Sequence, residues 1–188
     1  MRAADNPFTV QKLGRLRYRL DGLSWEALLD RLALLRYRAA IVGPHGHGKT
    51  TLLKELAPRL EERGFRIRCL MLHEGERRLG RDRRKILFRD LAPHDLLCVD
   101  GAEQLGRWAW QALRWRSRAA GGLLLTAHRP GLLPTLVTCE TTPELLGGIV
   151  EELLGRRPPK TEMAVLYSRH GGNVREALWE MYGRSADS

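Results

Sequence analysis

The residues with the clearest chemical signature lie between positions 43 and 51, where the run GPHGHGKT fits the pattern GxxxxGK[ST]. Glycines let successive backbone N–H groups turn toward one point, and the helix that follows adds positive potential at its N-terminus. Lys49 can reach the β- and γ-phosphates of a nucleotide, and Thr50 can offer a hydroxyl to magnesium. We therefore predict a cradle for ATP and Mg²⁺ formed by Gly43, Pro44, His45, Gly46, His47, Gly48, Lys49, Thr50 and Thr51.

A second magnesium ligand is expected at the end of another buried strand, because one loop hydroxyl fills only one coordination position. Asp100 directly follows the apolar run Leu96–Val99 and supplies a carboxylate. The stretch from Thr50 to Asp100 leaves room for one helix, one strand and one further crossover. Thr50 and Asp100 are therefore the predicted metal ligands, and Lys49 and Asp100 are predicted to serve catalysis.

Hydrolysis also requires a group that orients or deprotonates the attacking water. Many ATPases with this loop place a glutamate directly after the strand-end aspartate, but this chain has Gly101 there. Glu103 is the nearest acid on the same segment, and Glu74, after an earlier apolar run, is the rival candidate. Each is equally compatible with a solvated acid at the end of a helix or strand.

The elements that must position these residues alternate along the chain. Apolar runs predict five strands, and segments with apolar residues at helical spacing predict helices between them. The strands are expected at 39–42, 65–72, 96–99, 123–126 and 136–139, and the helices at 23–35, 49–63 and 103–118. Residues 77–90 form a basic segment for which no single structure is favoured, and three short helices are expected at 144–154, 161–169 and 174–182.

This alternation predicts an α/β fold in which a parallel sheet of about five strands is flanked by helices, with a small C-terminal helical lid. We expect residues 1–36 to form a basic N-terminal segment and a helix on the core, 37–142 the α/β core, and 143–188 the lid. With 188 residues, of which 43% are hydrophobic, the chain is long enough for one compact domain with a substantial core.

Composition also excludes several classes of protein. No apolar run approaches the ~20 residues that a membrane span needs, and the first residues lack the order of a secretory signal. A cytoplasmic protein without membrane contact is therefore expected. Cys69, Cys98 and Cys139 each lie inside an apolar run, without the spacing of a zinc site or a disulfide framework, and are predicted to be small core residues.

The charge balance favours a polyanionic partner. Lys and Arg number 32 against 22 Asp and Glu, which gives a net charge of +10. The densest cluster lies in residues 77–89, where Asp82 is the one acid among Arg77, Arg78, Arg81, Arg83, Arg84, Lys85 and Arg89. This segment could neutralise a nucleic-acid backbone. A solvated surface helix and a docking site for an acidic protein remain alternatives.

Tryptophans alternate with arginines in the segment that follows Asp100. Trp108, Trp110 and Trp115 lie among Arg107, Arg114, Arg116 and Arg118, a mixture that could stack the bases of a single strand. Trp108 and Trp115 are seven positions apart and share one helical face. Packing of these tryptophans onto the sheet is therefore favoured over stacking.

From about Asn6 to Tyr182 the sequence resembles a small AAA+ or AAA+-related P-loop ATPase. The resemblance rests on the run Asn6-Pro7-Phe8, the helix at 23–35, the loop GPHGHGKT and the strand LLCVDGAEQL, in that order. The runs TAHRP and GGNVREAL resemble two further segments that sense the nucleotide. The resemblance implies that His128 and Arg175 report the γ-phosphate, with Arg129 as an arginine finger across a subunit boundary as an alternative role.

The first hypothesis for function is an ATP-binding, slowly hydrolysing switch, with a DNA transaction, a protein partner or a homo-oligomer as its output. The second is a small kinase or nucleoside triphosphatase that acts on a metabolite. The third is a module that holds nucleotide without turnover, which Gly101 favours.

Overall fold

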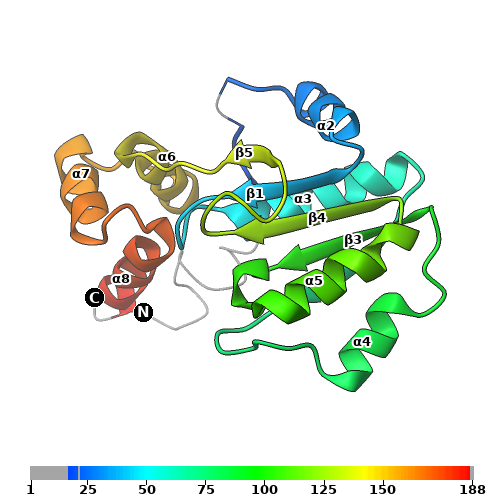
Figure 1. Ribbon diagram of the computed structural model, residues 1–188. Helices are drawn as coiled ribbons and strands as arrows, with labels where there is room; N and C mark the ends of the chain where they lie inside the picture. The colour runs from blue at the N-terminus through cyan, green and yellow to red at the C-terminus, as the bar shows by residue number, and fades with distance from the viewer. Residues whose placement is uncertain (1–16, 21, 187–188) are drawn as a thin grey trace. The chain divides into compact units, whose positions relative to one another are not determined.

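The computed structural model describes residues 17–20 and 22–186 (Figure 1). The run Asn6-Pro7-Phe8 lies outside this part of the chain. Two compact units are distinguished. The sheet unit comprises Tyr18–Gly43 and Gly48–Thr138, and the helical unit contains residues 139–186 together with Pro44–His47. Among the described residues, no helix combines the length and the apolar character that crossing a bilayer requires.

Five parallel strands form the centre of the sheet unit, which confirms the predicted fold class. The strands are β1 (Arg38–Val42), β2 (Arg66–Met71), β3 (Asp95–Asp100), β4 (Gly122–Ala127) and β5 (Thr135–Thr138). Their order across the sheet is β2-β3-β4-β1-β5, and every neighbouring pair is parallel. Because the strands are parallel, they all start at one end of the sheet, and the residues that follow β1, β3 and β4 all emerge at the other end, where the carboxyl ends of the strands lie.

Helices cover both faces of this sheet. Side chains alternate between the faces along each strand. Val42, Val99 and Leu125 pack with residues of α4 (Arg81–Phe88) and α5 (Arg107–Arg116). The helix α3 (Lys49–Glu62) packs across β1 to β4 on the other face, and α2 (Trp25–Leu34), capped by Ser24, lies against β5 (Figure 1).

The segment predicted as one helix at 103–118 is divided into three. A short 3-10 helix η2 (Ala102–Gln104) precedes α5, and a second, η3 (Ser117–Ala119), follows it. Leu105 and Gly106 are extended between η2 and α5, and the Gly106 N–H donates to the Arg77 carbonyl oxygen at 3.0 Å instead of to a helical partner. The break resets which residues of α5 face the sheet.

As a result, the prediction that Trp108 and Trp115 pack onto the sheet is wrong. Trp108 is 82% exposed and Trp115 is 67% exposed. Trp110 and Leu113, three positions apart, form the buried face of α5 instead. Two large aromatic side chains therefore lie on the surface of this helix.

The cysteine prediction is confirmed for Cys98 and Cys139, which are buried, and wrong for Cys69, which is exposed. Cys69 lies on β2, at the edge of the sheet, and so one of its sides has no neighbouring strand. It is the register partner of Cys98 on β3. A hydrogen bond from the Cys98 thiol lowers the pKa of Cys69 to about 7, and the same bond, with burial, raises the pKa of Cys98.

The helical unit contains three helices, as the sequence predicts. They are α6 (Pro143–Leu154), α7 (Lys160–Arg169) and α8 (Val174–Ala186). Thr142 caps α6 through its hydroxyl, and the side chain of Asn173 accepts from the Glu176 N–H at the start of α8. Their shared core includes Leu146, Val150, Met163, Leu166 and Ala177.

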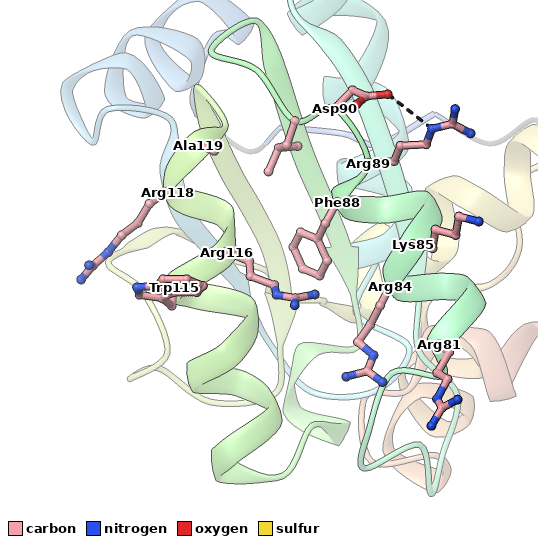
Figure 2. A pocket seen from close by; sticks show the side chains of 11 residues that line it. Arg81, Arg84, Lys85, Phe88, Arg89, Asp90, Trp115, Arg116, Arg118 and Ala119 are labelled. Atoms are coloured by element: carbon pink, nitrogen blue, oxygen red, sulfur yellow. Dashed lines mark ion pairs between the residues drawn. The ribbon is translucent and has the colours of Figure 1, made fainter.

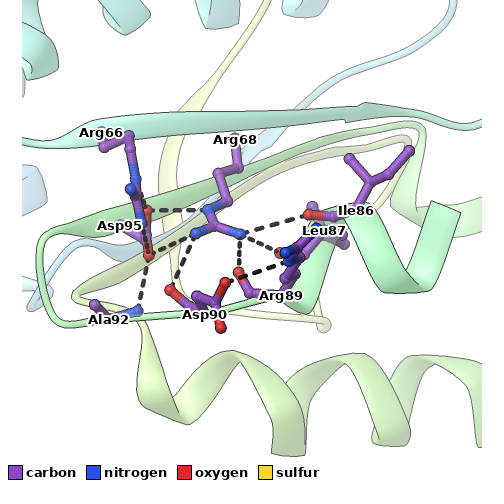
Figure 3. A network of polar contacts seen from close by, with 8 residues as sticks. All are labelled: Arg66, Arg68, Ile86, Leu87, Arg89, Asp90, Ala92 and Asp95. Carbon is purple, nitrogen blue, oxygen red and sulfur yellow. Dashed lines mark hydrogen bonds and ion pairs between the residues drawn. The ribbon is translucent and has the colours of Figure 1, made fainter.

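A buried ion-pair network fixes the start of β3 (Figure 3). The Asp95 side chain is fully buried and accepts from Arg66 Nε at 2.5 Å and from Arg68 Nε at 3.0 Å. The Ala92 N–H donates to its second carboxylate oxygen at 2.8 Å. Chiefly because of the hydrogen bonds from Arg66, the pKa of Asp95 is held well below its usual range.

Arg68 extends the network to the end of α4. Its guanidinium also donates to the carbonyl oxygens of Arg89, at 2.5 Å, and Asp90, at 3.2 Å (Figure 3). The carboxylate that orients Arg68 therefore also anchors α4 to the edge strand β2.

We expect Asp95→Asn to lower the free energy of unfolding by about 3 kcal/mol at neutral pH, because two guanidinium groups lose a buried counter-charge. A depressed pKa in the folded state stabilises the protein above the unfolded pKa near 4, and this contribution is lost as the pH falls toward the folded value. The deficit of the variant should therefore narrow between pH 7 and pH 3 in urea unfolding. Asp90→Asn is the control, since Asp90 is exposed; an equal deficit at both pH values would contradict the electrostatic explanation.

Candidate nucleotide-binding site

The predicted phosphate-binding loop, Gly43–Thr50, leaves the carboxyl end of β1 and leads into α3. Gly48 caps the helix with a left-handed backbone, φ +79°. A Cβ atom at this position would also lie 3.1 Å from a ring carbon of Tyr18. Both the backbone angle and the close approach of the ring therefore require glycine here.

Lys49 folds back over the loop. Its ammonium group donates to the Gly43 carbonyl oxygen at 2.6 Å, and the residue is only 8% exposed. A buried ammonium is costly unless it is hydrogen-bonded, and so the site holds a positive charge where the loop begins. This is the charge that the sequence pattern predicts next to nucleotide phosphates.

The loop is joined directly to the predicted second metal ligand. Thr50 Oγ1 donates to Asp100 Oδ2 at 2.8 Å, from the first turn of α3 to the end of β3. The other carboxylate oxygen, Oδ1, accepts from Thr126 Oγ1 at 2.6 Å. Thr126 Oγ1 in turn accepts from the Gly101 N–H at 2.8 Å. Residues from two neighbouring elements, α3 and β4, therefore orient the carboxylate at the end of β3.

Thr126 is the site residue that sequence reasoning missed. It lies at the end of β4 and is 1% exposed. Its signal is a hydroxyl in the otherwise apolar strand GLLLTA, because a buried hydroxyl needs hydrogen-bond partners.

The donor set fits magnesium. A threonine hydroxyl and an aspartate carboxylate are hard oxygen ligands, and Mg²⁺ is commonly held by one or two such groups together with substrate phosphates and water. Asp100 and Thr50 already lie within hydrogen-bond distance of each other, and Lys49 directly precedes Thr50 in the sequence. The residues present are therefore suited to a magnesium-bound polyphosphate.

Gly101 has a structural reason to be glycine. Its φ is +80°, and a Cβ atom there would lie 2.9 Å from the Leu72 carbonyl oxygen. A glutamate at this position would need a strained backbone and a shift of the strand end. The fold therefore disfavours any side chain directly after Asp100.

Glu103, two residues further on, occupies η2 and pairs with His128. Its Oε1 atom lies 2.9 Å from His128 Nε2, at the end of β4. Its Oε2 atom is buried and, in the described part of the chain, has no hydrogen-bond partner. Glu74 is exposed in a turn after β2. The structure thus brings Glu103 and His128 together at the edge where β3 and β4 end, and it leaves Glu74 on the surface.

The remaining predicted residues are placed as follows. Pro44 and His45 are exposed, whereas Gly46, His47 and Thr51 are partly buried. One ring nitrogen of His47 lies 2.8 Å from the His45 carbonyl oxygen. Arg175 is exposed in the first turn of α8, and Arg129 is exposed after β4.

The fold matches solved structures of RuvB from Thermotoga maritima. The Holliday junction branch migration motor RuvB has a TM-score of 0.57 at 18% identity, over 94% of this chain and 63% of that chain. One variant of RuvB has a TM-score of 0.57 at 19% identity, covering 85% of this chain and 61% of that chain. Another has a TM-score of 0.57 at 19% identity, covering 88% and 64%. No protein-family model and no curated protein sequence matches the chain.

This chain therefore spans less than two thirds of the length of the RuvB structures that it resembles. At these identities the likeness concerns the fold.

We expect Gly101→Ala to destabilise the protein more than Gly64→Ala does. Both positions have a left-handed backbone, φ +80° and φ +89°, so both variants carry a similar conformational cost of about 1 kcal/mol. A Cβ at Gly64 meets no atom within 4 Å, whereas at Gly101 it meets the Leu72 carbonyl oxygen. The further loss at Gly101 should be about 1–3 kcal/mol in urea unfolding. Equal losses of unfolding free energy in the two variants would show that the end of β2 at Leu72 shifts without a measurable cost.

Proposed function

Starting from an AAA+-related P-loop NTPase fold, which the likeness to RuvB supports, we propose that this chain binds ATP with Mg²⁺, hydrolyses it slowly and acts as a nucleotide-dependent switch. The observation that carries the proposal is the 2.8 Å hydrogen bond between Thr50 and Asp100. This bond joins the phosphate-binding loop to the carboxylate at the end of β3. A purely structural bond would not need the buried Lys49 directly before Thr50 in the sequence.

In the proposed complex, the loop amides and the ammonium of Lys49 bind the β- and γ-phosphates. Thr50 and Asp100 would hold Mg²⁺, which when bound neutralises phosphate charge. Thr126 keeps the Asp100 carboxylate oriented through its hydrogen bond to Oδ1. Gly43, Pro44, His45, Gly46, His47, Gly48 and Thr51 complete the proposed cradle.

Glu103 is the proposed acceptor of the water proton. Water attacks the γ-phosphorus, the bond from that atom to the β,γ-bridging oxygen breaks, and ADP and inorganic phosphate leave. Glu103 Oε2 accepts the proton while Oε1 remains paired with His128, 2.9 Å away. The pairing restrains the carboxylate, and a restrained acid two residues beyond the usual position is consistent with slow turnover.

The switch itself is proposed to involve His128 in the sheet unit and Arg175 in the helical unit, each of which reports the γ-phosphate. The output is the affinity for a partner. RuvB is a Holliday junction branch migration motor, and this likeness, with the net charge of +10, favours a nucleic-acid context over a metabolite kinase. A homo-oligomer with Arg129 at a subunit boundary is a further element of the proposal.

A module that binds nucleotide without turnover is the second candidate, because the fold disfavours an acid directly after Asp100. The two candidates differ in a single measurement, the cleavage of ATP in one turnover with protein in excess. Cleavage supports the hydrolase, and its absence in a protein that binds ATP supports the module.

We expect Lys49→Ala to weaken ATP binding at least tenfold, because it removes the buried ammonium that would face the phosphates. Isothermal titration with ATP and Mg²⁺ measures this loss. Lys54→Ala is the matched control, since Lys54 is an exposed lysine on the same helix α3. Unchanged affinity of the Lys49 variant, or an equal loss in the Lys54 variant, would contradict the site.

We expect Glu103→Gln to slow single-turnover ATP cleavage by about 100-fold while ATP affinity stays within about threefold, because the amide keeps the shape but accepts no proton. Glu74→Gln, at an exposed acid, should leave the rate unchanged. The reverse result, with the Glu74 variant slow and the Glu103 variant normal, would move the role to Glu74.

A further inference from the structure

An open groove of about 980 Å³ lies between α4 and the end of α5 (Figure 2). Leu91, which lines it, precedes β3, and Ala119, on its other side, precedes β4. These strands are parallel, so their amino ends lie together at one end of the sheet and their carboxyl ends lie together at the other. The groove therefore opens near the edge opposite to the phosphate-binding loop and is a separate site.

The groove is strongly basic. Asp90 is the one acid in its lining, and it pairs with Arg89 at 3.3 Å. Within residues 17–20 and 22–186, the other five cations of the lining form no ion pair with a carboxylate. The six cations are Arg81, Arg84, Lys85, Arg89, Arg116 and Arg118. Cations gathered from α4, the end of α5 and η3 create a positive potential that attracts polyanions.

The groove also has an exposed aromatic surface. Trp115 is 67% exposed and lies between Arg114 and Arg116 in sequence. Figure 2 shows Arg84 and Arg116 extending into the space between the helices, with Phe88 beside them. The guanidinium of Arg116 lies 5.5 Å from the centroid of the Phe88 ring. In the same view the side chains of Trp115 and Arg118 extend from the other side of α5, away from α4.

Both walls of the groove are anchored to the sheet. Arg68, held by Asp95, donates to the carbonyl oxygens at the end of α4. On the other side, Arg38 donates to the carbonyl oxygens of Ser117, at 2.7 Å, and Ala120, at 2.9 Å. The cations and the indole are therefore presented on a preorganised surface, which reduces the entropy cost of binding.

We propose that this groove binds single-stranded nucleic acid, with backbone phosphates at Arg84, Arg116 and Arg118 and an unpaired base stacked on Trp115. Cations that follow a backbone beside an exposed aromatic ring are the features that single strands use, and a base inside a duplex offers no free face to the indole. An acidic peptide would satisfy the arginines but would leave Trp115 without a stacking partner. The inference deepens the proposed function by naming its partner, yet the binding itself requires no ATP.

The test is fluorescence anisotropy of a labelled oligo(dT) strand with the full chain, without nucleotide. Affinity should fall about 20-fold between about 50 mM and about 200 mM salt if three phosphates are neutralised. Trp115→Leu should weaken binding about tenfold through the loss of one stacked base. Trp108→Leu, at an exposed tryptophan on the same helix but outside the groove, should change it less than twofold.

Two double variants, which remove equal charge inside and outside the groove, test the contribution of the cations to binding. Arg84→Gln with Arg116→Gln removes two groove cations and should reduce both affinity and the salt dependence. Arg107→Gln with Arg114→Gln removes the same charge from exposed positions of α5 outside the groove. Circular dichroism and thermal unfolding of each variant establish that the fold is kept.

Three results would overturn the inference. These are equal losses for the groove and control variants, duplex binding as tight as oligo(dT) binding, and competition by poly-glutamate as effective as that by unlabelled oligo(dT). The last result would assign the groove to an acidic protein. The Lys49→Ala variant separates this inference from the proposed function. It should bind oligo(dT) normally, and a wild-type protein that binds ATP but no oligonucleotide would refute the groove alone.

Discussion

The carboxylate of Asp100 is the constraint on which the candidate site depends. Thr50 bonds one oxygen and Thr126 the other, so the end of β3 is tied both to the start of α3 and to the end of β4. Thr126 also accepts the N–H of Gly101, which fixes the turn after the strand. A carboxylate restrained on both oxygens has its orientation set before any ligand arrives. That restraint would lower the reorganisation cost of binding the proposed metal–nucleotide complex.

The turn at Gly101 has a consequence for the position of the acid. The left-handed backbone and the Leu72 carbonyl oxygen disfavour a side chain at position 101, and the next acid along the chain is Glu103, inside η2. There the carboxylate meets His128 from the end of β4. The chain lacks a glutamate directly after Asp100, but η2 brings the carboxylate of Glu103 to the place where β3 and β4 end. An acid is therefore still present at the carboxyl ends of these strands.

The sequence predicted most of the fold because its signals are local. Apolar runs identified the five parallel strands, and GxxxxGK[ST] identified the turn between β1 and α3. The errors arose where a tertiary contact decides the outcome. The bond from Gly106 to the Arg77 carbonyl oxygen breaks the predicted helix and turns Trp108 and Trp115 outward. The edge position of β2 exposes Cys69.

The candidate site was predictable to a similar extent and for the same reason. Lys49, Thr50 and Asp100 belong to contiguous motifs, and the structure brings the two motifs together. The partner of Asp100 on β4 could not be found by spacing, because Thr126 reaches it only through the pairing of β3 with β4. The pairing of Glu103 with His128 likewise depends on how η2 turns back toward the strand ends.

The two ends of β3 connect the features that matter for function. Asp95 at its start holds the arginine that anchors α4, and Asp100 at its end holds the loop. The strand between them is buried and paired on both sides, so it fixes the distance between the two regions and cannot itself act as a moving part. Any coupling of nucleotide to the groove must therefore use an element that leaves the sheet. The segment from Glu103 in η2 through α5 to Trp115 is one continuous stretch of chain that reaches both regions.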